Sequence, residues 1–196
     1  MKLRFARKNL CIPYALFLAL FVICPIFIML FYAFTDANNS FTLNNFGKIF
    51  SDTTTLSAIL TSLSTAIVTT AICLLLGYPV AYILARSGLK HTQTLLLLFI
   101  LPMWINFVMR LNALKEFLSL INLLDKSPYL NTVIGMVYDF LPFMILPLYT
   151  TLIKLDKSVI EASTDLGANS FQTLVRVVIP LSMPGVISGI TMVFMP

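Results

Sequence analysis

The chain has 196 residues, of which 59% are hydrophobic and only 11% are charged, a balance that excludes an ordinary soluble domain and indicates a membrane protein. Its formal net charge of +5 comes without a basic stripe that alternates with aromatic residues, so we do not expect nucleic-acid binding. The three cysteines lack metal-ligand spacing and His91 is the single histidine, so we expect neither a metal site nor a cofactor.

Long charge-free segments define the predicted membrane spans. The first three lie between Lys8 and Asp36, between Asp52 and Arg86, and between His91 and Arg110. Each is long enough for a transmembrane helix, which needs about 20 apolar residues. A fourth span, residues 131–153, carries only the charge of Asp139, and a fifth begins at Pro184. We therefore predict one all-α polytopic domain over residues 1–196, with four full spans and a partial fifth.

Glycine and proline predict bends inside three of these spans. Pro25 is expected to kink the first span, Gly77-Tyr78-Pro79 to break or bend the second, and Pro102 to interrupt the third. Such breaks are tolerated in a membrane where neighbouring helices satisfy the freed backbone groups.

The positive charges predict the orientation of the chain. Lys2, Arg4, Arg7 and Lys8 precede the first span without an acid, and Arg86 and Lys90 lie between the second and third spans. The segment 36–52 instead holds one lysine and two acids. By the positive-inside rule, the N-terminus, the 86–93 loop and the loop that contains Glu161 are cytoplasmic.

The polar loop at residues 154–183 is predicted to hold two short helices. Ser158 and Glu161 form a capping-box pattern for the first, and Gly167 stands where a left-handed residue ends it. Apolar residues recur at helical spacing at Leu155, Val159, Ala162 and Leu166. Asn169 and Gln172 repeat the capping pattern for the second helix. Pro180 and Pro184 are expected to stop that helix and to start the next span.

This loop closely resembles the EAA loop in the permease subunits of bacterial ABC importers. The resemblance rests on Glu161-Ala162, on Gly167 and on the Val177-x-Ile179-Pro180 ending. Ser163 stands where that family most often has a second alanine, and Ile179 where it usually has leucine. In the family this loop couples transport to a cytoplasmic ATPase subunit, so the resemblance implies coupling roles for Glu161, Ala162, Ser163 and Gly167. The alternative is an ordinary amphipathic hairpin with a glycine cap.

The membrane segments look like the permease of spermidine/putrescine importers from about Phe41 to the last residue. The matching stretches are Leu76–Ala81, Pro102–Asn106 with Arg110, Leu141–Met144, Pro147–Tyr149 and Lys154–Lys157. This resemblance implies a polyamine importer of the bacterial inner membrane. Its expected partners are a second permease subunit, two ATPase subunits, an extracytoplasmic polyamine-binding protein and membrane lipid. Permeases of this family continue with two full spans beyond the loop, so we expect the domain to be incomplete at the C-terminus, as a fragment, a frameshifted gene or a short form.

The sequence offers no catalytic constellation and no Gly-rich phosphate loop with its lysine, so we do not expect an enzyme that hydrolyses ATP by itself. A helical rise of 1.5 Å per residue places Trp104 about 15 Å from the cytoplasmic side. The same count places Asp139 about 12 Å from the outer side of a roughly 30 Å core. Near the midplane, an acid marks a transport pathway by default, and an aromatic face attracts an ammonium group.

We therefore expect Trp104 and Asp139, with Asn106 and Tyr138, to line a path for a cation. Two structural alternatives remain: Trp104 packs between helices, or Asp139 pairs with Arg110 or with a cation of another subunit. Arg110 itself is expected near the outer surface as a snorkelling arginine. At the level of function, the alternatives are an importer of this architecture for an inorganic anion or a sugar, and a membrane scaffold or channel without an ATPase.

Overall fold

The computed structural model describes residues 11–36, 40–88, 90, 92–121 and 127–195. Within these ranges every regular element is a helix, beside one isolated bridge between Thr35 and Phe41, so the prediction of an all-α chain is confirmed. The basic N-terminal residues 2–8 and His91 lie outside the described residues. The chain divides into two compact units, one ending at Leu60 and one beginning at Thr61, and each is described by itself.

The described helices include four that are long and apolar enough to cross a membrane. They are Pro13–Ala33, Thr53–Arg86, Pro128–Leu152 and Ser170–Phe194. A fifth crossing is possible if the bent pair Thr92–Trp104 and Phe107–Leu120 forms one span.

The first unit contains one span and a short helix that follows it. The span consists of α1 (Cys11–Leu18), a π-helical turn (Ala19–Ile23) and α2 (Cys24–Ala33). The short helix is α3 (Asn44–Ser51). The Asn45 side-chain amide donates to the carbonyls of Ala33 and Thr35, at 3.3 and 3.1 Å. These bonds satisfy carbonyls at the end of α2 that have no partner within the helix.

At two prolines, Pro25 and Pro180, the preceding turn of the helix is π-helical. One turn, Ala19–Ile23, comes just before Pro25, and the other, Leu174–Val178, comes just before Pro180. A proline has no N–H to donate, and its ring clashes with the carbonyl four residues earlier. The wider π-helical turn relieves that clash without ending the helix.

The core of the second unit lies between α4 (Thr53–Arg86), α7 (Pro128–Leu152) and α10 (Ile179–Phe194). Five of the seven buried residues of α4 recur every four positions, at Thr65, Thr69, Cys73, Gly77 and Ala81. They form one stripe, which packs against a partner helix as i, i+4 rows do. The fully buried side chains on α7 include Met144, Ile145, Leu148 and Leu152.

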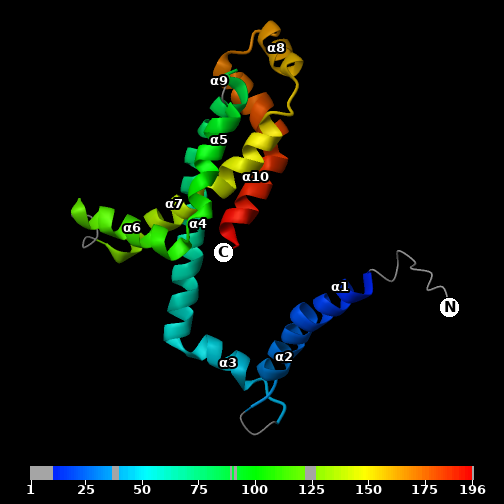
Figure 1. Cartoon of the computed structure of the whole chain (residues 1–196), viewed down its shortest axis with the longest axis vertical. Helices are drawn as coiled ribbons and strands as arrows, with labels where there is room; N and C mark the ends of the chain where they lie inside the picture. Colours follow the sequence, from blue (N-terminus) through cyan, green and yellow to red (C-terminus); the bar gives the residue numbers. More distant parts are fainter. Residues whose placement is uncertain (1–10, 37–39, 89, 91, 122–126, 196) are drawn as a thin grey trace, which may run out of the picture. The chain divides into compact units, whose positions relative to one another are not determined.

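Glycines allow α10 to lie very close to α7, which it contacts along its length (Figure 1). A Cβ atom on Gly185 would lie 2.6 Å from Thr151 Oγ1 and 2.9 Å from the Pro147 carbonyl oxygen. A Cβ on Gly189 would lie 2.6 Å from Met144 Sδ. Lipid is as apolar as a leucine side chain, so membrane helices associate through such close packing and not through the hydrophobic effect.

Of the predicted break or bend at Gly77-Tyr78-Pro79, the break is wrong, because α4 continues through all three residues to Arg86, and the bend stays a prediction. Gly77 serves close packing instead: a Cβ there would lie 3.0 Å from Met144 Cγ. The Tyr78 hydroxyl lies 2.9 Å from Ser182 Oγ and joins α4 to α10. Packing against two neighbouring helices therefore keeps α4 continuous past a proline that would otherwise weaken it.

The predicted third span is divided more sharply than an interruption at Pro102 implies. It consists of α5 (Thr92–Ile100), a 3₁₀ turn (Leu101–Trp104) and α6 (Phe107–Leu120), and the chain bends by 99° between the two parts. Ile105 provides the bend with an extended backbone at φ −80° and ψ 142°. Asn106 then starts α6, because its side chain accepts a hydrogen bond from the Val108 N–H at 2.9 Å.

The helix at the end of the chain also differs from the prediction. It begins at Ser170 with α9 (Ser170–Thr173), continues through the π-helical turn and α10, and contains Pro184 in its interior. The expected stop and restart at Pro180 and Pro184 is therefore wrong. The widened turn before Pro180 and the packing of α10 on α7 hold this segment as one helix of 25 residues.

Candidate functional site

The polar loop forms two helices joined by a left-handed glycine. The first, α8 (Lys157–Asp165), is followed by Gly167 with φ +85°, a conformation that side chains other than glycine rarely adopt. Asn169 and Gln172 then form the predicted capping box at the start of α9, with bonds of 2.8 and 3.0 Å. The prediction of two short helices divided at Gly167 is confirmed, although the second continues into α10.

The cap of α8 lies two residues earlier than predicted. Asp156, rather than Ser158, is the N-cap, and its carboxylate accepts a 3.0 Å hydrogen bond from the Ser158 N–H. That backbone hydrogen bond holds the pKa of the Asp156 carboxyl below its usual value. The carboxylate also lies at the positive end of the α8 dipole, where a negative charge is favourable.

The predicted apolar stripe of α8 faces outward over most of its length. Val159 and Ala162 are exposed, and Leu166 is 89% exposed. Glu161 lies beside them and is also exposed. Phe171, at the start of the next helix, is a further large exposed apolar residue. An acid among exposed apolar side chains on a rigid turn is suited to contact with another protein.

Ser163 has a different position from the other three predicted coupling residues. It is buried, and its hydroxyl lies 2.9 Å from Thr173 Oγ1 and donates to the Ile160 carbonyl at 2.7 Å. The first of these contacts joins α8 to α9. Ser163 therefore fixes the angle between the two helices and is not part of their outer face.

The loop is also attached to the membrane helices. The Arg86 guanidinium, at the end of α4, donates to the Leu155 carbonyl at 3.0 Å. Leu155 and Ile160 pack against the core that α4, α7 and α10 share. A displacement of α8 therefore acts on these three helices through direct contacts.

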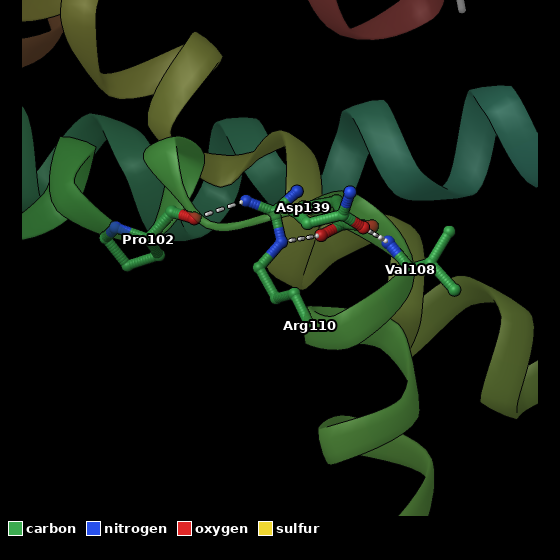
Figure 2. A network of polar contacts seen from close by, with 5 residues as sticks. Pro102, Val108, Arg110 and Asp139 are labelled. Atoms are coloured by element: carbon green, nitrogen blue, oxygen red, sulfur yellow. Dashed lines mark hydrogen bonds and ion pairs between the residues drawn. The ribbon is translucent and has the colours of Figure 1, made fainter.

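A second cluster of polar contacts lies where α6 meets α7 (Figure 2). Arg110 Nε is 2.6 Å from Asp139 Oδ1, and Arg110 Nη1 donates to the Pro102 carbonyl at 3.0 Å. The two charged side chains are 9% and 4% exposed. The alternative that Asp139 pairs with Arg110 is therefore what the structure shows.

The geometry of this ion pair is unusual in one respect. The two atoms are close, but the N–H of Arg110 Nε does not point at Asp139 Oδ1 as it would in a hydrogen bond. Among the described residues, neither of these two atoms has a hydrogen-bond partner. An arginine–carboxylate pair is strongest when two parallel N–H···O bonds form. The Arg110–Asp139 pair holds two opposite charges together without that alignment.

Aromatic rings complete the surroundings of the guanidinium. Arg110 Cζ lies 5.8 Å from the centre of the Tyr138 ring and 6.0 Å from the centre of the Phe107 ring. Both distances are within the range of cation–π attraction. A carboxylate, a carbonyl and two rings therefore meet at one cation.

Two of the four predicted path residues, Tyr138 and Asp139, meet in this cluster. Asn106 is linked to it through the backbone, since its carbonyl accepts the Arg110 N–H at 3.1 Å. Trp104 is not brought into it: its side chain is 88% exposed, and in the described part of the chain its indole forms no hydrogen bond or ring contact.

The expectation that Arg110 is a snorkelling arginine is wrong, because its side chain is 9% exposed and lies against Asp139. The depth count assumed that the helix keeps rising beyond Trp104, but the 99° bend turns α6 away from that axis. Arg110 therefore meets Asp139 instead of snorkelling outward. The pair itself is one of the structural alternatives given above, and each of its residues is the lone charge of an otherwise uncharged stretch, 92–114 and 127–153.

Comparison with known proteins shows that the chain is similar to membrane components of bacterial transport systems. Residues 74–196 match the family described as "Binding-protein-dependent transport system inner membrane component". The spermidine/putrescine transport system permease protein PotB of Escherichia coli (strain K12) is 37% identical over 206 residues, which cover 91% of this chain and 72% of that protein. PotB of Haemophilus influenzae is 40% identical over 181 residues, 85% of this chain and 61% of that protein. A PotB homolog of Mycoplasma pneumoniae is 38% identical over 132 residues, 61% of this chain and 46% of that protein.

Proposed function

Because the chain belongs to the family of binding-protein-dependent transport system inner membrane components, we propose that it is a permease subunit of an ATP-driven polyamine importer. The observation that carries the substrate class is the buried carboxylate of Asp139 beside the Tyr138 ring, since these groups suit an ammonium ion. The names of the relatives, which specify spermidine and putrescine, support it.

The proposed assembly contains partners on both sides of the bacterial inner membrane. A second permease subunit completes the path, two ATPase subunits bind in the cytoplasm, and an extracytoplasmic protein delivers the polyamine. The N-terminus, Arg86 and the α8–α9 loop face the cytoplasm in this arrangement, as the distribution of positive charges favours.

The outer face of α8 is the proposed contact with the ATPase. Glu161 supplies a charge, Ala162 permits a close approach, and Leu166 fills an apolar site on the partner. Gly167 and Ser163 hold this face at a fixed angle to the next helix. ATP-driven closure of the ATPases moves α8, and the contacts of Leu155 and Ile160 with the core pass the movement to the membrane helices.

The proposed path for the polyamine lies along the broken span and α7. Asp139 and Tyr138 bind an ammonium group, Trp104 offers an exposed ring, and Asn106 places the start of α6 beside them. Alternating access then opens this path first to one side of the membrane and then to the other.

Uptake by the complete transporter in sealed vesicles tests this function. We expect ATP-dependent uptake of labelled spermidine that putrescine inhibits and that phosphate or a neutral sugar does not. Inhibition by phosphate or by the sugar instead would show an importer of this architecture for another solute. Failure of any ATPase to co-purify would favour a membrane scaffold or channel.

Variants in the two regions distinguish coupling to the ATPase from binding of the polyamine. Glu161→Lys combined with Gly167→Ala should leave ATP hydrolysis in place but uncouple it from uptake, with Glu116→Lys, an exposed acid on α6, as the matched control. Asp139→Asn and Trp104→Ala should lower the spermidine uptake measured per molecule of folded transporter. Normal uptake in both path variants would contradict the path assignment.

A further inference from the structure

Arg110 occupies a site that has the chemistry of an ammonium-binding site. Its guanidinium is held by the Asp139 carboxylate, by the Pro102 carbonyl and by the faces of the Phe107 and Tyr138 rings. An acceptor with a negative charge, a neutral acceptor and aromatic faces are the groups that bind ammonium ions in proteins. The cation at their centre comes from the chain itself.

We propose that Arg110 is a resident cation in this site and that an ammonium group of the substrate displaces it during transport. This inference rests on the proposed function, because it assigns a competitor to the same polyamine path. Arg110 thereby becomes a specificity-determining residue: only a ligand that carries a positive charge and reaches Asp139 can take its place.

While Asp139 is ionised, the electrostatics of the cluster favour one cation beside it. Asp139 is 3% exposed, and an ionised carboxylate without a partner is costly at such a position. While Arg110 is bound, the pair is neutral overall. When an ammonium group replaces the guanidinium, the site is neutral again, and Arg110 regains solvent. A neutral or negative solute offers no such exchange.

The geometry of the pair permits this exchange. The 2.6 Å contact between Arg110 Nε and Asp139 Oδ1 lacks the alignment of a hydrogen bond, so Arg110 gives up less on leaving than it would in a bidentate pair. Arg110 lies on α6, which starts just after the bend, and most of this helix is exposed. A change of the long arginine side chain, or a small tilt of α6, is enough to free Asp139.

Uptake kinetics of the complete transporter test the displacement. In Arg110→Gln the competitor is absent and Asp139 remains, so the KM for spermidine should fall, by about tenfold if the arginine leaves the site free for a tenth of the time. Arg110→Lys keeps a competing cation and should stay close to the original KM. An unchanged or raised KM in a folded Arg110→Gln transporter would overturn the proposal.

A stability measurement keeps the proposal testable if Arg110→Gln folds poorly. Spermidine should raise the thermal stability of the purified Arg110→Gln complex more than that of the original complex, because it supplies the missing cation. Spermidine should stabilise neither Arg110→Gln/Asp139→Asn nor Arg86→Gln more than it stabilises the original complex. Arg86→Gln is the control because it removes a half-buried arginine outside the cluster. Equal stabilisation of all four proteins would show that the ion pair is only structural.

A second probe separates this inference from the proposed function. Arg110→Ala leaves room for a small cation, so methylguanidinium should stabilise the Arg110→Ala complex and not the Arg110→Ala/Asp139→Asn complex. This result would support a cation site even if the original transporter took up no spermidine, in which case the proposed substrate would be wrong. Normal spermidine uptake without any stabilisation of Arg110→Ala would leave the proposed function standing and overturn the resident-cation role.

Discussion

The α8–α9 loop and the Arg110–Asp139 cluster each centre on an acidic residue, but the two acids have opposite surroundings. Glu161 is exposed on a short helix whose ends are fixed by a cap and a left-handed glycine. Asp139 is buried beside a cation that another helix supplies. An exposed acid is free to meet a partner protein, whereas a buried ionised acid needs a positive charge beside it. The two regions therefore suit the two halves of transport, coupling and substrate binding.

The largest expected effect comes from removing one partner of the buried pair. Asp139→Leu leaves the Arg110 guanidinium without its counter-ion, which costs up to about 3–5 kcal/mol where the guanidinium stays buried, whereas Arg110→Leu/Asp139→Leu should be nearly neutral. We expect the single variant to lose folded transporter and the double variant to recover it. Glu116→Leu, an exposed acid on α6, is the control. Folded yield in size-exclusion chromatography measures the difference, and equal yields of the single and double variants would contradict the role of the pair.

A substitution at the left-handed glycine of the loop should affect the coupling of ATP hydrolysis to uptake and not the folding of the membrane helices. Gly167→Val places a branched side chain at φ +85° and should cost about 1–2 kcal/mol locally. The number of ATP molecules hydrolysed per spermidine should rise, because α8 no longer keeps its angle. Gly167→Asn should be milder, since asparagine tolerates the left-handed conformation.

Gly47→Val is the matched control for that substitution, because Gly47 has open space around it and no positive φ. If it raised the ATP cost of uptake as much as Gly167→Val does, the special role of the left-handed turn would be contradicted.

A smaller effect is expected at the contact between the two loop helices. Ser163→Ala removes the hydroxyl that meets the buried Thr173 Oγ1, a change of about 1 kcal/mol. The amides of α8 should then exchange hydrogen faster. Ser188→Ala, which removes an exposed hydroxyl from α10, should leave α8 unaffected. Unchanged exchange in Ser163→Ala would mean that the hydroxyl pair does not hold the helices together.

The smallest expected effect is a pH dependence of the start of α8. The pKa of Asp156 is lower in the folded chain than in the unfolded chain, so its contribution to stability is fully present above the unfolded pKa, near 4. That contribution is lost as the pH falls through the lower, folded pKa. Hydrogen exchange at Ser158, corrected for its intrinsic pH dependence, should be constant from pH 7 to about 5 and faster in more acidic solution. Asp156→Asn should remove this dependence, and its persistence in that variant would contradict the assignment.

Local patterns in the sequence predicted much of the loop but less of the membrane helices. The capping box at Asn169 and the turn at Gly167 depend on neighbouring residues, so they could be read directly. The continuity of α4 past Pro79 depends on packing against α7 and α10, which no local pattern reports. The same holds for Ser163, whose inward position follows from Thr173 on another helix.

The choice between a snorkelling Arg110 and an Arg110 paired with Asp139 also depends on more than local pattern. A count of residues along a straight helix gives depth only while the axis continues, and the extended backbone at Ile105 ends it. The bend brings two lone charges together that the count had placed at different levels.

We assign binding of the ATPase to the α8–α9 loop and binding of the substrate to the Arg110–Asp139 cluster. This assignment is tested most directly by purifying two variant transporters and measuring the ATPase that remains bound. Leu166→Glu puts a charge on the outer face of α8, and Arg110→Gln/Asp139→Asn neutralises the buried pair. We predict that the first variant binds its ATPase about tenfold more weakly, as a loss of about 1.4 kcal/mol at the contact would cause, and so loses ATPase during purification. The second should keep its ATPase while losing spermidine uptake. Full retention of the ATPase by Leu166→Glu, or its loss from the neutral pair variant, would contradict the assignment of coupling to the loop and of substrate binding to the cluster.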